Sequence, residues 1–447
     1  MRLPTFAAGL ALALLMPVQA SAQTEMETST SEQGPLDRRA NDVIGWLRGE
    51  IVPQDLFTAQ FLAQIPAETL AQMNSQLASQ FGAVLGVESV ERQGPLRARI
   101  AIRFERAIGS GTMVLADAGE ARIAGLQLSD FTPVISEGAE SESDQSDAEA
   151  IAADLAALPG ATAAWFGPLD GEAVFAYGDA DRQFALGSAF KLYVLGAVTE
   201  AVANGRLRWD QVVPLGQASF PSGITQSWPE GAPMTVQSLA TLMISISDNT
   251  ATDTLLRLVG RDRVEDFLRR TGHSAPERSL PFLTTRELFL LKTLDTGPAY
   301  AAADIPTRRA MLAGLDSDGV TTDEVVAALG EPNLVEELEW FASMEDERKL
   351  LRALVALDDP VLFDILAVSP QLSETQRAGW AYAGFKGGSE TGVLNLTWLL
   401  RDEAGQWHML ATSWLNPEAP VENAALGLLA VRIPVSYTHL RAHETGR

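Results

Sequence analysis

Ser188 and Lys191 form the first pattern in this sequence that could carry out chemistry. Ser188 stands at the start of a predicted helix, so the spacing places its hydroxyl and the lysine amine on one helical face. An uncharged lysine could take the serine proton, and the helix N-terminus would favour negative charge on the serine oxygen. The alternative interpretation is structural: Ser188 is an N-cap and Lys191 is an exposed helix residue.

Lysine is rare in this chain, at four of the 33 basic residues, and a second lysine opens another pattern. In Lys386-Gly387-Gly388-Ser389, the glycines would let a substrate lie against the backbone and the lysine could hold an anion. Between the two lysines, Ser247-Asp248-Asn249 follows an apolar helix predicted over residues 239–246. In isolation, Lys386-Gly387-Gly388-Ser389 could be a hairpin turn and Ser247-Asp248-Asn249 a helix stop.

Along the chain the three patterns occur in the order Ser-x-x-Lys, Ser-Asp-Asn and Lys-Gly-Gly. Together they resemble the active-site set of class A β-lactamases and penicillin-binding proteins. The resemblance covers about residues 150–434 and implies an antiparallel sheet packed with helices. It resembles two-domain members such as the hydrolase-like protein of clavulanic-acid clusters, on the acidic linker, the small preceding domain and the segments Leu280–Glu287 and Lys386–Glu390. It implies an exported serine hydrolase that acts on a β-lactam, a small ester or a peptide-like amide, without a metal or another cofactor.

The resemblance also implies a role for each site residue. Ser188 would be the acylated nucleophile, Lys191 its general base, and Ser247 a hydroxyl that relays protons to the leaving nitrogen. Asn249 would bind a substrate amide and Lys191, and Lys386 would attract a substrate carboxylate. A penicillin-recognising sensor, acylated but slowly deacylated, is the alternative, and a domain kept only for interaction is a third hypothesis.

Two departures from the family pattern affect these expectations. Family members usually carry Thr or Ser where this chain has Gly387, so the hydroxyl of Ser389 or Thr391 is expected to substitute. The resemblance implies an oxyanion hole made by the amides of Ser188 and Ser389, with Gly387 and Gly388 among the substrate-binding residues. The glutamate that activates the deacylating water in class A enzymes has no clear equivalent, and Glu277 is a weak candidate whose alternative is a surface glutamate.

The surrounding sequence predicts an α+β protein of several domains. Helical patterns precede alternating strand-like runs before residue 136, which resembles a small cone-type domain of the steroid-isomerase or nuclear-transport-factor kind. Its ligand or partner stays open. In the second domain, strand-like runs at both ends with helices between them predict that the chain returns to complete its first sheet. The expected segments are a signal peptide (1–22), a polar leader (23–36), the small domain (37–136), an acidic linker (137–150), the hydrolase-like domain (151–434) and a sequencing-adapter-like end (435–447).

The composition of the chain excludes or disfavours several classes of binding partner and metal site. The chain has 58 acidic and 33 basic residues, a formal charge of -25, which disfavours nucleic acid. It has no cysteine, which excludes disulfides, thiolate metal sites and lipid attachment at a cysteine. The apolar run near the N-terminus is too short to span a bilayer, so a periplasmic or secreted protein that binds a small-molecule substrate is expected, with a retained N-terminal anchor as the alternative.

Histidine offers a poor basis for a different mechanism. Two of the four histidines, His439 and His443, fall in the adapter-like end. His273 is expected as a helix C-cap and His408 as a surface or interface residue on an amphipathic strand, so a Ser-His-Asp triad is the weaker hypothesis.

Overall fold

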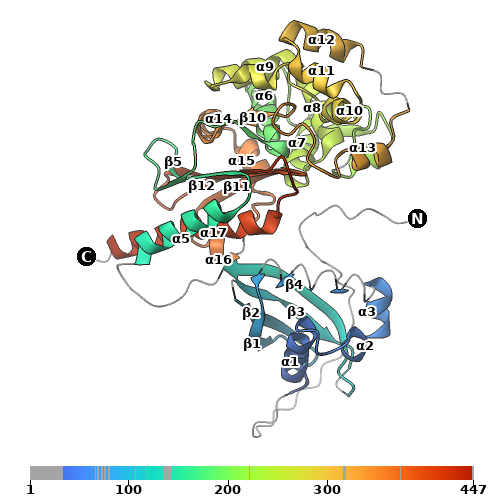
Figure 1. The fold of residues 1–447 in the computed structure, drawn as a ribbon, viewed down its shortest axis with the longest axis vertical. Helices are drawn as coiled ribbons and strands as arrows, with labels where there is room; N and C mark the ends of the chain where they lie inside the picture. Colours follow the sequence, from blue (N-terminus) through green and yellow to red (C-terminus); the bar gives the residue numbers. More distant parts are fainter. Residues whose placement is uncertain are drawn as a thin grey trace. The chain divides into compact units, whose positions relative to one another are not determined.

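In the computed structural model, the chain divides into two compact units, Met1–Gly138 and Ala139–Arg447 (Figure 1). The structure describes residues 34–133 and 143–444, apart from residues 66, 68–69, 72–73, 75–76, 79–80, 106, 118, 221, 316–318 and 373. The predicted signal peptide, most of the polar leader, and residues 445–447 therefore lie outside the described residues, as do residues 134–142 around the acidic linker.

The first unit combines short helices with a four-stranded antiparallel sheet in the order β1-β2-β3-β4. Strand β2 alternates as predicted, because Ala98, Ile100, Ile102 and Phe104 are buried and the residues between them are more exposed. The described elements are α1 (Pro35–Leu47), α2 (Pro53–Leu56), α3 (Ala59–Gln64), β1 (Val84–Arg92), β2 (Arg97–Phe104), β3 (Ala107–Leu115) and β4 (Ile123–Pro133). The likeness to steroid-isomerase domains stays a prediction.

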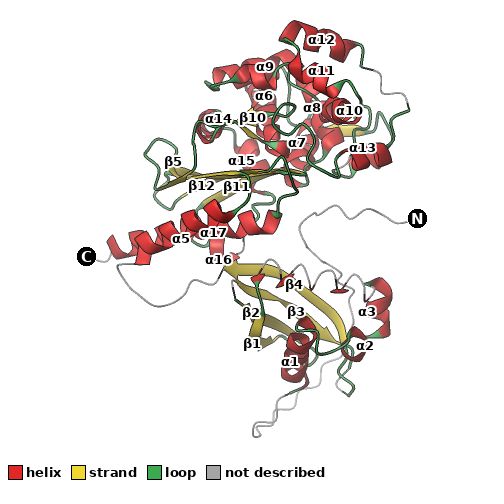
Figure 2. Cartoon of the chain, viewed as in Figure 1, coloured by secondary structure: helices red, strands yellow, loops and turns green. Residues whose placement is uncertain are grey.

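The second unit is built on a five-stranded antiparallel sheet in the order β11-β12-β13-β5-β6 (Figure 2). The expectation that the chain returns to its first strands is confirmed, because β13 pairs with β5 from Leu415 opposite Ala161 to His408 opposite Pro168. The strands are β5 (Ala161–Pro168), β6 (Phe175–Tyr177), β11 (Tyr382–Glu390), β12 (Val393–Arg401) and β13 (Trp407–Leu415). Strand β11 is an edge strand of this sheet.

Helices cover both faces of the sheet (Figure 1). On one face, α5 (Ser143–Ala157) and α17 (Asn423–Glu444) close a core that contains Leu155, Trp398 and Leu426. On the other face, a larger core surrounds α6, which is buried along most of its length. The helices on this side are α6 (Lys191–Ala203), α7 (Val236–Ser245), α8 (Asn249–Val259), α9 (Arg261–Arg270), α10 (Thr285–Thr293), α11 (Gly297–Ala302), α12 (Ile305–Ala313), α13 (Thr322–Ala328), α14 (Met344–Ala356) and α15 (Pro360–Ala367). Helix α13 packs in a separate small cluster with Phe220 and Leu290.

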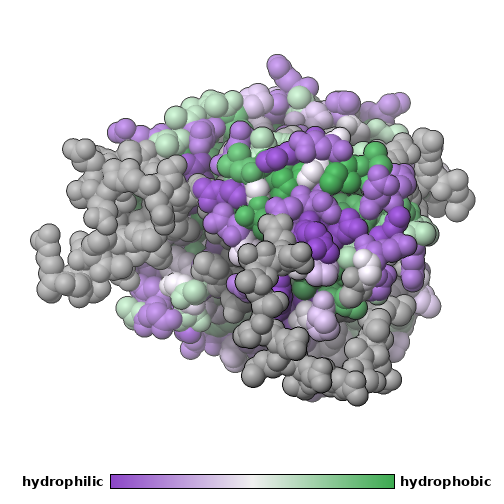
Figure 3. All heavy atoms as spheres, turned by 90° about the horizontal axis from the view of Figure 1, so that it is seen from below, coloured by the Kyte–Doolittle hydropathy of each residue, from purple (hydrophilic) through white to green (hydrophobic). Residues whose placement is uncertain are grey.

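Smaller elements complete the second unit. The short strand β7 (Phe184–Ala185) pairs with β10 (Phe341–Ala342), and β8 (Val212–Pro214) pairs with β9 (Pro233–Thr235). The remaining described elements are the 3-10 turns η1 (Gly187–Phe190), η2 (Thr225–Ser227) and η3 (Pro276–Ser279) and the short helix α16 (Glu374–Arg377). On the face drawn in Figure 3, hydrophobic residues are interspersed with hydrophilic ones.

The structure corrects several local expectations. Helix α5 begins at Ser143, inside the predicted linker, and α17 continues past Pro434 to Glu444, into the adapter-like end. The apolar positions of residues 334–342 favour a helix, but the structure forms none there, because Leu334 has a positive φ of 51° and Phe341 pairs with β7. Lys386-Gly387-Gly388 lies within β11 rather than in a hairpin turn, so its lysine is held by a paired strand.

Gly388 fixes how closely β11 approaches η1. A Cβ at this position would lie 1.9 Å from the carbonyl oxygen of Leu186, 2.4 Å from the amide nitrogen of Ser188 and 2.5 Å from that of Ala189. All three are backbone atoms, which cannot rotate away. At the neighbouring Gly387, the Cβ would instead meet the end of a side chain, Phe385 Cζ at 2.8 Å.

We therefore expect Gly388→Ala to destabilise the protein by at least about 3 kcal/mol, because the strand must separate from η1 to make room. The matched change Gly387→Ala should cost about 1 kcal/mol, since the ring of Phe385 can move. Urea denaturation of both variants measures the difference, and equal stabilities would contradict the close approach described above.

Candidate active site

Ser188 and Lys191 lie at the junction of η1 and α6. Ser188 is in the 3-10 turn and is half-buried, and Lys191 is the first residue of the α-helix. The turn is fixed from both sides, because Leu186 donates its amide to the carbonyl of Trp340 and Gly187 has a φ of 47°. The predicted helix start is therefore a tighter turn, which keeps Ser188 one turn before Lys191.

The amine of Lys191 is fully buried and lies among three oxygen atoms. Its Nζ is 2.7 Å from the carbonyl oxygen of Ser247, 2.9 Å from Ser247 Oγ and 2.7 Å from Asn249 Oδ1. A neutral amine satisfies this arrangement with two N–H donors to the carbonyl oxygens and a lone pair that accepts from the Ser247 hydroxyl. Burial, followed by the nearby charge of Lys386, lowers the pKa of Lys191 well below its ordinary value.

Ser247 occupies a strained position between α7 and α8. Its φ is 59°, a left-handed conformation that costs a residue with a side chain about 1 kcal/mol or more. The conformation is held in place because Ser222 Oγ donates to the Ser247 carbonyl at 2.7 Å, and Asp248 caps the start of α8. The result is that the carbonyl and the hydroxyl of Ser247 both face Lys191.

Asp248 and Asn249 hold this loop from the inside. The buried Asp248 carboxylate accepts hydrogen bonds from the amides of Ile224, Thr225 and Ala251 and from the Thr225 hydroxyl. Asn249 donates its side-chain amide to the carbonyl of Phe220 at 3.0 Å, which directs its oxygen to Lys191. In the Ser-Asp-Asn pattern, Asp248 is thus a positioning residue.

Lys386 brings β11 into the same cluster. Its Nζ donates to Ser247 Oγ at 3.2 Å and to the carbonyl of Gly387 at 2.5 Å. Burial lowers the pKa of Lys386 to about 7, because no carboxylate offsets the cost of removing its charge from water. Ser247 Oγ therefore lies between two buried amines, where it can accept a proton from one and donate to the other.

The backbone of β11 also reaches Ser188. A Cβ on Gly187 would lie 2.9 Å from the amide nitrogen of Ser389, so the loop before Ser188 and that amide are in close contact. Ser389 itself is exposed. This placement is compatible with an oxyanion site made by the amides of Ser188 and Ser389, which remains a proposal.

Two of the expected hydroxyl and carboxylate groups lie elsewhere. Thr391 donates its hydroxyl to the carbonyl of Leu329 at 2.5 Å, so it does not replace the hydroxyl missing at Gly387. Glu277 is exposed in η3, which fits the surface glutamate of the alternative interpretation. In the described part of the chain, no Asp or Glu side chain forms a hydrogen bond or ion pair with the amines of Lys191 or Lys386.

His408 is buried, and the expectation that it lies at a surface is wrong. Its strand, β13, is internal to the sheet, and its ring stacks on Phe166 with centroids 6.1 Å apart. His408 Nε2 lies 3.3 Å from Asp402 Oδ2. His273 is also buried, with Nε2 2.8 Å from the carbonyl of Phe341. Over the described residues, no group of three or more His, Asp or Glu side chains is arranged to hold a metal ion.

Glu347 is a buried carboxyl that sequence reasoning missed. It accepts from Asn395 Nδ2 at 2.8 Å and from the hydroxyl of Thr397. These two residues of β12 pair with Gly388 and Lys386 of β11, so Glu347 supports from the core the strand that pairs with β11. In the sequence, Glu347 looks like the other acidic residues at the start of α14, and only the tertiary fold shows that its side chain points inward.

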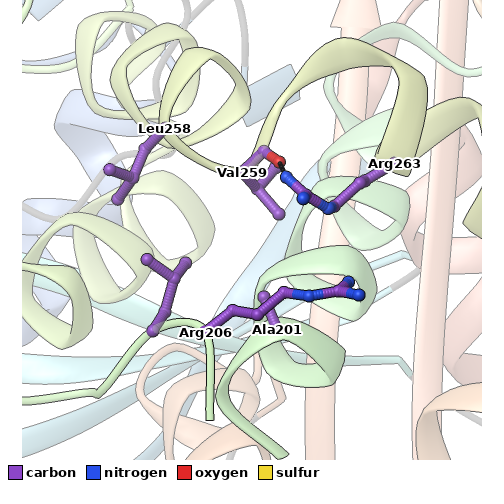
Figure 4. A pocket seen from close by; sticks show the side chains of 6 residues that line it. Ala201, Arg206, Leu258, Val259 and Arg263 are labelled. Carbon is purple, nitrogen blue, oxygen red and sulfur yellow. Dashed lines mark hydrogen bonds between the residues drawn. The ribbon is translucent and has the colours of Figure 1, made fainter. Parts of the chain in front are cut away.

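A surface pocket lies at the opposite end of α6 from Lys191 (Figure 4). Its lining combines Leu207, Leu258 and Val259 with Arg206 and Arg263. With 13 residues, α6 separates it from the lysine cluster by about 20 Å. The pocket is therefore distinct from the candidate active site.

A family match over part of the second unit agrees with its fold. Residues 147–304 match the model of the beta-lactamase enzyme family. With its antiparallel sheet packed between helices, the second unit has the fold of the serine hydrolases that comprise β-lactamases and penicillin-binding proteins.

Particular relatives are distant. The β-lactamase from Sphaerobacter thermophilus DSM 20745 is 23% identical with a TM-score of 0.44, over 64% of this chain and 95% of that one. PBP-A is 18% identical with a TM-score of 0.43, over 67% and 97% of the two chains. A β-lactamase from Chitinophaga pinensis DSM 2588 is 16% identical with a TM-score of 0.44, over 67% and 99%. No curated protein matches the chain.

Glu347 generates a prediction about stability and pH. Burial raises its pKa from 4.5 to about 7, so the folded protein holds a proton that the unfolded chain releases. The stabilising effect of this proton is present below pH 4.5 and is lost as the pH rises through about 7. Between pH 5 and 8, the free energy of unfolding of the wild type should fall by about 3 kcal/mol relative to that of Glu347→Gln.

Urea denaturation of both proteins at several pH values measures this difference. Glu345→Gln, on the same helix with a less buried side chain, is the matched control and should follow the wild type. A constant difference between wild type and Glu347→Gln across this pH range would contradict the buried, protonated carboxyl.

Proposed function

We propose that the second unit is a serine hydrolase that forms an acyl-enzyme at Ser188. The observation that carries the proposal is the buried, carboxylate-free amine of Lys191, held one turn after Ser188 by Ser247 and Asn249. A lysine whose pKa is lowered by burial and by a second lysine is suited to act as a general base at neutral pH.

In the proposed acylation, Lys191 takes the proton of Ser188 while Ser188 Oγ attacks a carbonyl carbon of the substrate. Ser188 Oγ has no hydrogen-bond partner among the described residues, so it is free to turn toward either the amine or a substrate. Such contacts commonly tighten only when substrate binds. The negative charge that develops on the carbonyl oxygen would be stabilised by the amides of Ser188 and Ser389.

Breakdown of the tetrahedral intermediate requires a proton on the leaving nitrogen or oxygen. Ser247 Oγ is placed between the amines of Lys191 and Lys386, at 2.9 and 3.2 Å. It can donate its own proton to the leaving group and recover one from Lys191. This path restores neutral Lys191 at the end of acylation.

The preferred substrates are β-lactams, small esters or peptide-like amides that carry an anionic group. The Lys386 amine is the buried cation of the site, and a bound carboxylate would favour its charged form over the neutral one. Since the pKa of Lys386 is about 7 without a ligand, binding of anionic substrates should weaken as the pH rises above this value.

A penicillin-recognising sensor is the second candidate. It is favoured by the position of Glu277, the candidate for the water-activating glutamate of class A enzymes, which lies exposed in η3. A sensor would form the same acyl-enzyme and release it slowly. The lifetime of the acyl-enzyme therefore separates the two functions.

Export to the periplasm or the exterior of the cell is a further part of the proposal. It rests on the N-terminal sequence, which lies outside the described residues. Within those residues, none of the helices has the length and apolar character needed to cross a bilayer. The ligand or partner of the first unit stays open.

The acyl-enzyme gives the direct test. Incubation of the full chain with benzylpenicillin or an activated ester should add the mass of the acyl group, and peptide mapping should place it on Ser188. Ser188→Ala should abolish the adduct, and Lys191→Met should slow its formation by at least about 100-fold, as expected for the loss of a general base.

Ser274→Ala is the matched control, because Ser274 is an exposed serine that bonds to Asp346 instead of the lysine cluster. It should be acylated at the wild-type rate. The absence of an adduct on wild-type Ser188 with several such compounds would contradict the proposed function.

A further inference from the structure

Three residues of β11 face the α6 side of the sheet at alternate positions: Lys386, Gly388 and Glu390. Gly388 abuts the backbone of Ser188, and Lys386 contacts Ser247 on one side of it. Residues two apart on a strand are separated by about 7 Å. Glu390 therefore lies on the opposite side of Gly388 from Lys386, about 7 Å along the strand from the glycine that abuts Ser188.

Glu390 belongs to a buried group of three charged residues that acylation does not use. Lys292 Nζ lies 2.5 Å from Glu390 Oε1 and 2.7 Å from Glu339 Oε1. The side chains of Lys292 and Glu339 are fully buried, whereas that of Glu390 keeps 9% of its surface exposed. Glu390 is thus the member of the group that solvent can reach.

The buried group contains two carboxyl groups and one amine. Lys292, from α10, is shared by two carboxyl groups, and Glu339 Oε2 receives no hydrogen bond from a donor. Burial, and contact with Glu339, raise the pKa of Glu390 well above its ordinary value, although Lys292 opposes this effect. An acid in such a setting keeps its proton to a higher pH than an exposed glutamate, so its ionised form is a stronger base.

We propose that Glu390 is the catalytic carboxylate that activates water for hydrolysis of the Ser188 acyl-enzyme. This inference rests on the proposed function and supplies the group that Glu277 does not. Lys292 and Glu339 are positioning residues, because they hold the Glu390 carboxyl beside the acylated serine.

The step balances as an ester hydrolysis. Ionised Glu390 takes one proton from water while the water oxygen forms a bond to the acyl carbon. The tetrahedral intermediate then collapses, the bond between Ser188 Oγ and the acyl carbon breaks, and Ser188 Oγ takes up a proton delivered from Glu390 through the site. The products are free Ser188, the carboxylic acid and ionised Glu390, ready for another turnover.

The test follows acylation and deacylation separately in the full chain, with benzylpenicillin as the probe and intact mass as the readout. Glu390→Gln should be acylated at a rate within about twofold of the wild type, because Glu390 has no part in that step. Its deacylation should slow by about 100-fold at pH 8, as expected when a general base is lost. Glu277→Gln is the matched control and should behave as the wild type.

A pH profile distinguishes catalysis from a structural role. The wild-type deacylation rate should rise with pH through the titration of Glu390, and Glu390→Gln should lack this rise. Lys292→Met removes the cation that favours ionised Glu390, so the rise should persist but move to higher pH. If the three residues served only as an anchor for α10, neither variant would change the form or position of the profile.

The failures of the two proposals differ. Equal acyl-enzyme lifetimes in the wild type and Glu390→Gln, or an unshifted profile in Lys292→Met, would overturn the role of Glu390 and leave the serine hydrolase intact. A wild type that forms no adduct on Ser188 would overturn the proposed function and this inference with it. Should Glu390→Gln fold poorly, the Lys292→Met profile still decides the question.

Discussion

The site depends on an amine that has been taken out of water without a carboxylate to compensate it. Lys191 is fully buried, and its contacts are the carbonyl and hydroxyl oxygens of Ser247 and the side-chain oxygen of Asn249. Removing an ammonium ion from water is costly, so its proton is released more readily. The positive charge of Lys386 acts in the same direction, whereas Asp253 and Asp248 oppose it from a greater distance.

Much of the second unit serves to maintain this condition. The left-handed backbone of Ser247 is held by Ser222 and by the cap at Asp248, and the glycine at position 388 lets β11 come against η1. Each feature has a local cost, in backbone strain or in the lost side chain. Together they bring two lysine amines to one serine hydroxyl. The rest of the protein is acidic, with a formal charge of -25 for the whole chain.

The central motifs could be predicted from sequence because their residues are rare and their order is specific. Strand β2 and the return of β13 to β5 also follow from alternation and connection rules. The buried acids could not be predicted in this way. Glu347, Glu339 and Glu390 look like surface glutamates in the sequence, and their burial depends on contacts with segments far along the chain. The conformation of Leu334 could not be predicted either, because its positive φ is set by packing and not by local propensity.

The charge state of Lys191 is the quantity on which the account depends, and lysine-selective 13C NMR measures it directly. The chain contains four lysines, so the Cε resonances can be assigned with one substitution each. The resonance of Lys191 should change to the chemical shift of a neutral amine well below the pH at which an ordinary lysine titrates, that of Lys386 should titrate near pH 7, and Lys386→Met should raise the pKa of Lys191. A Lys191 resonance that stays in the ammonium form up to pH 10 would contradict the account.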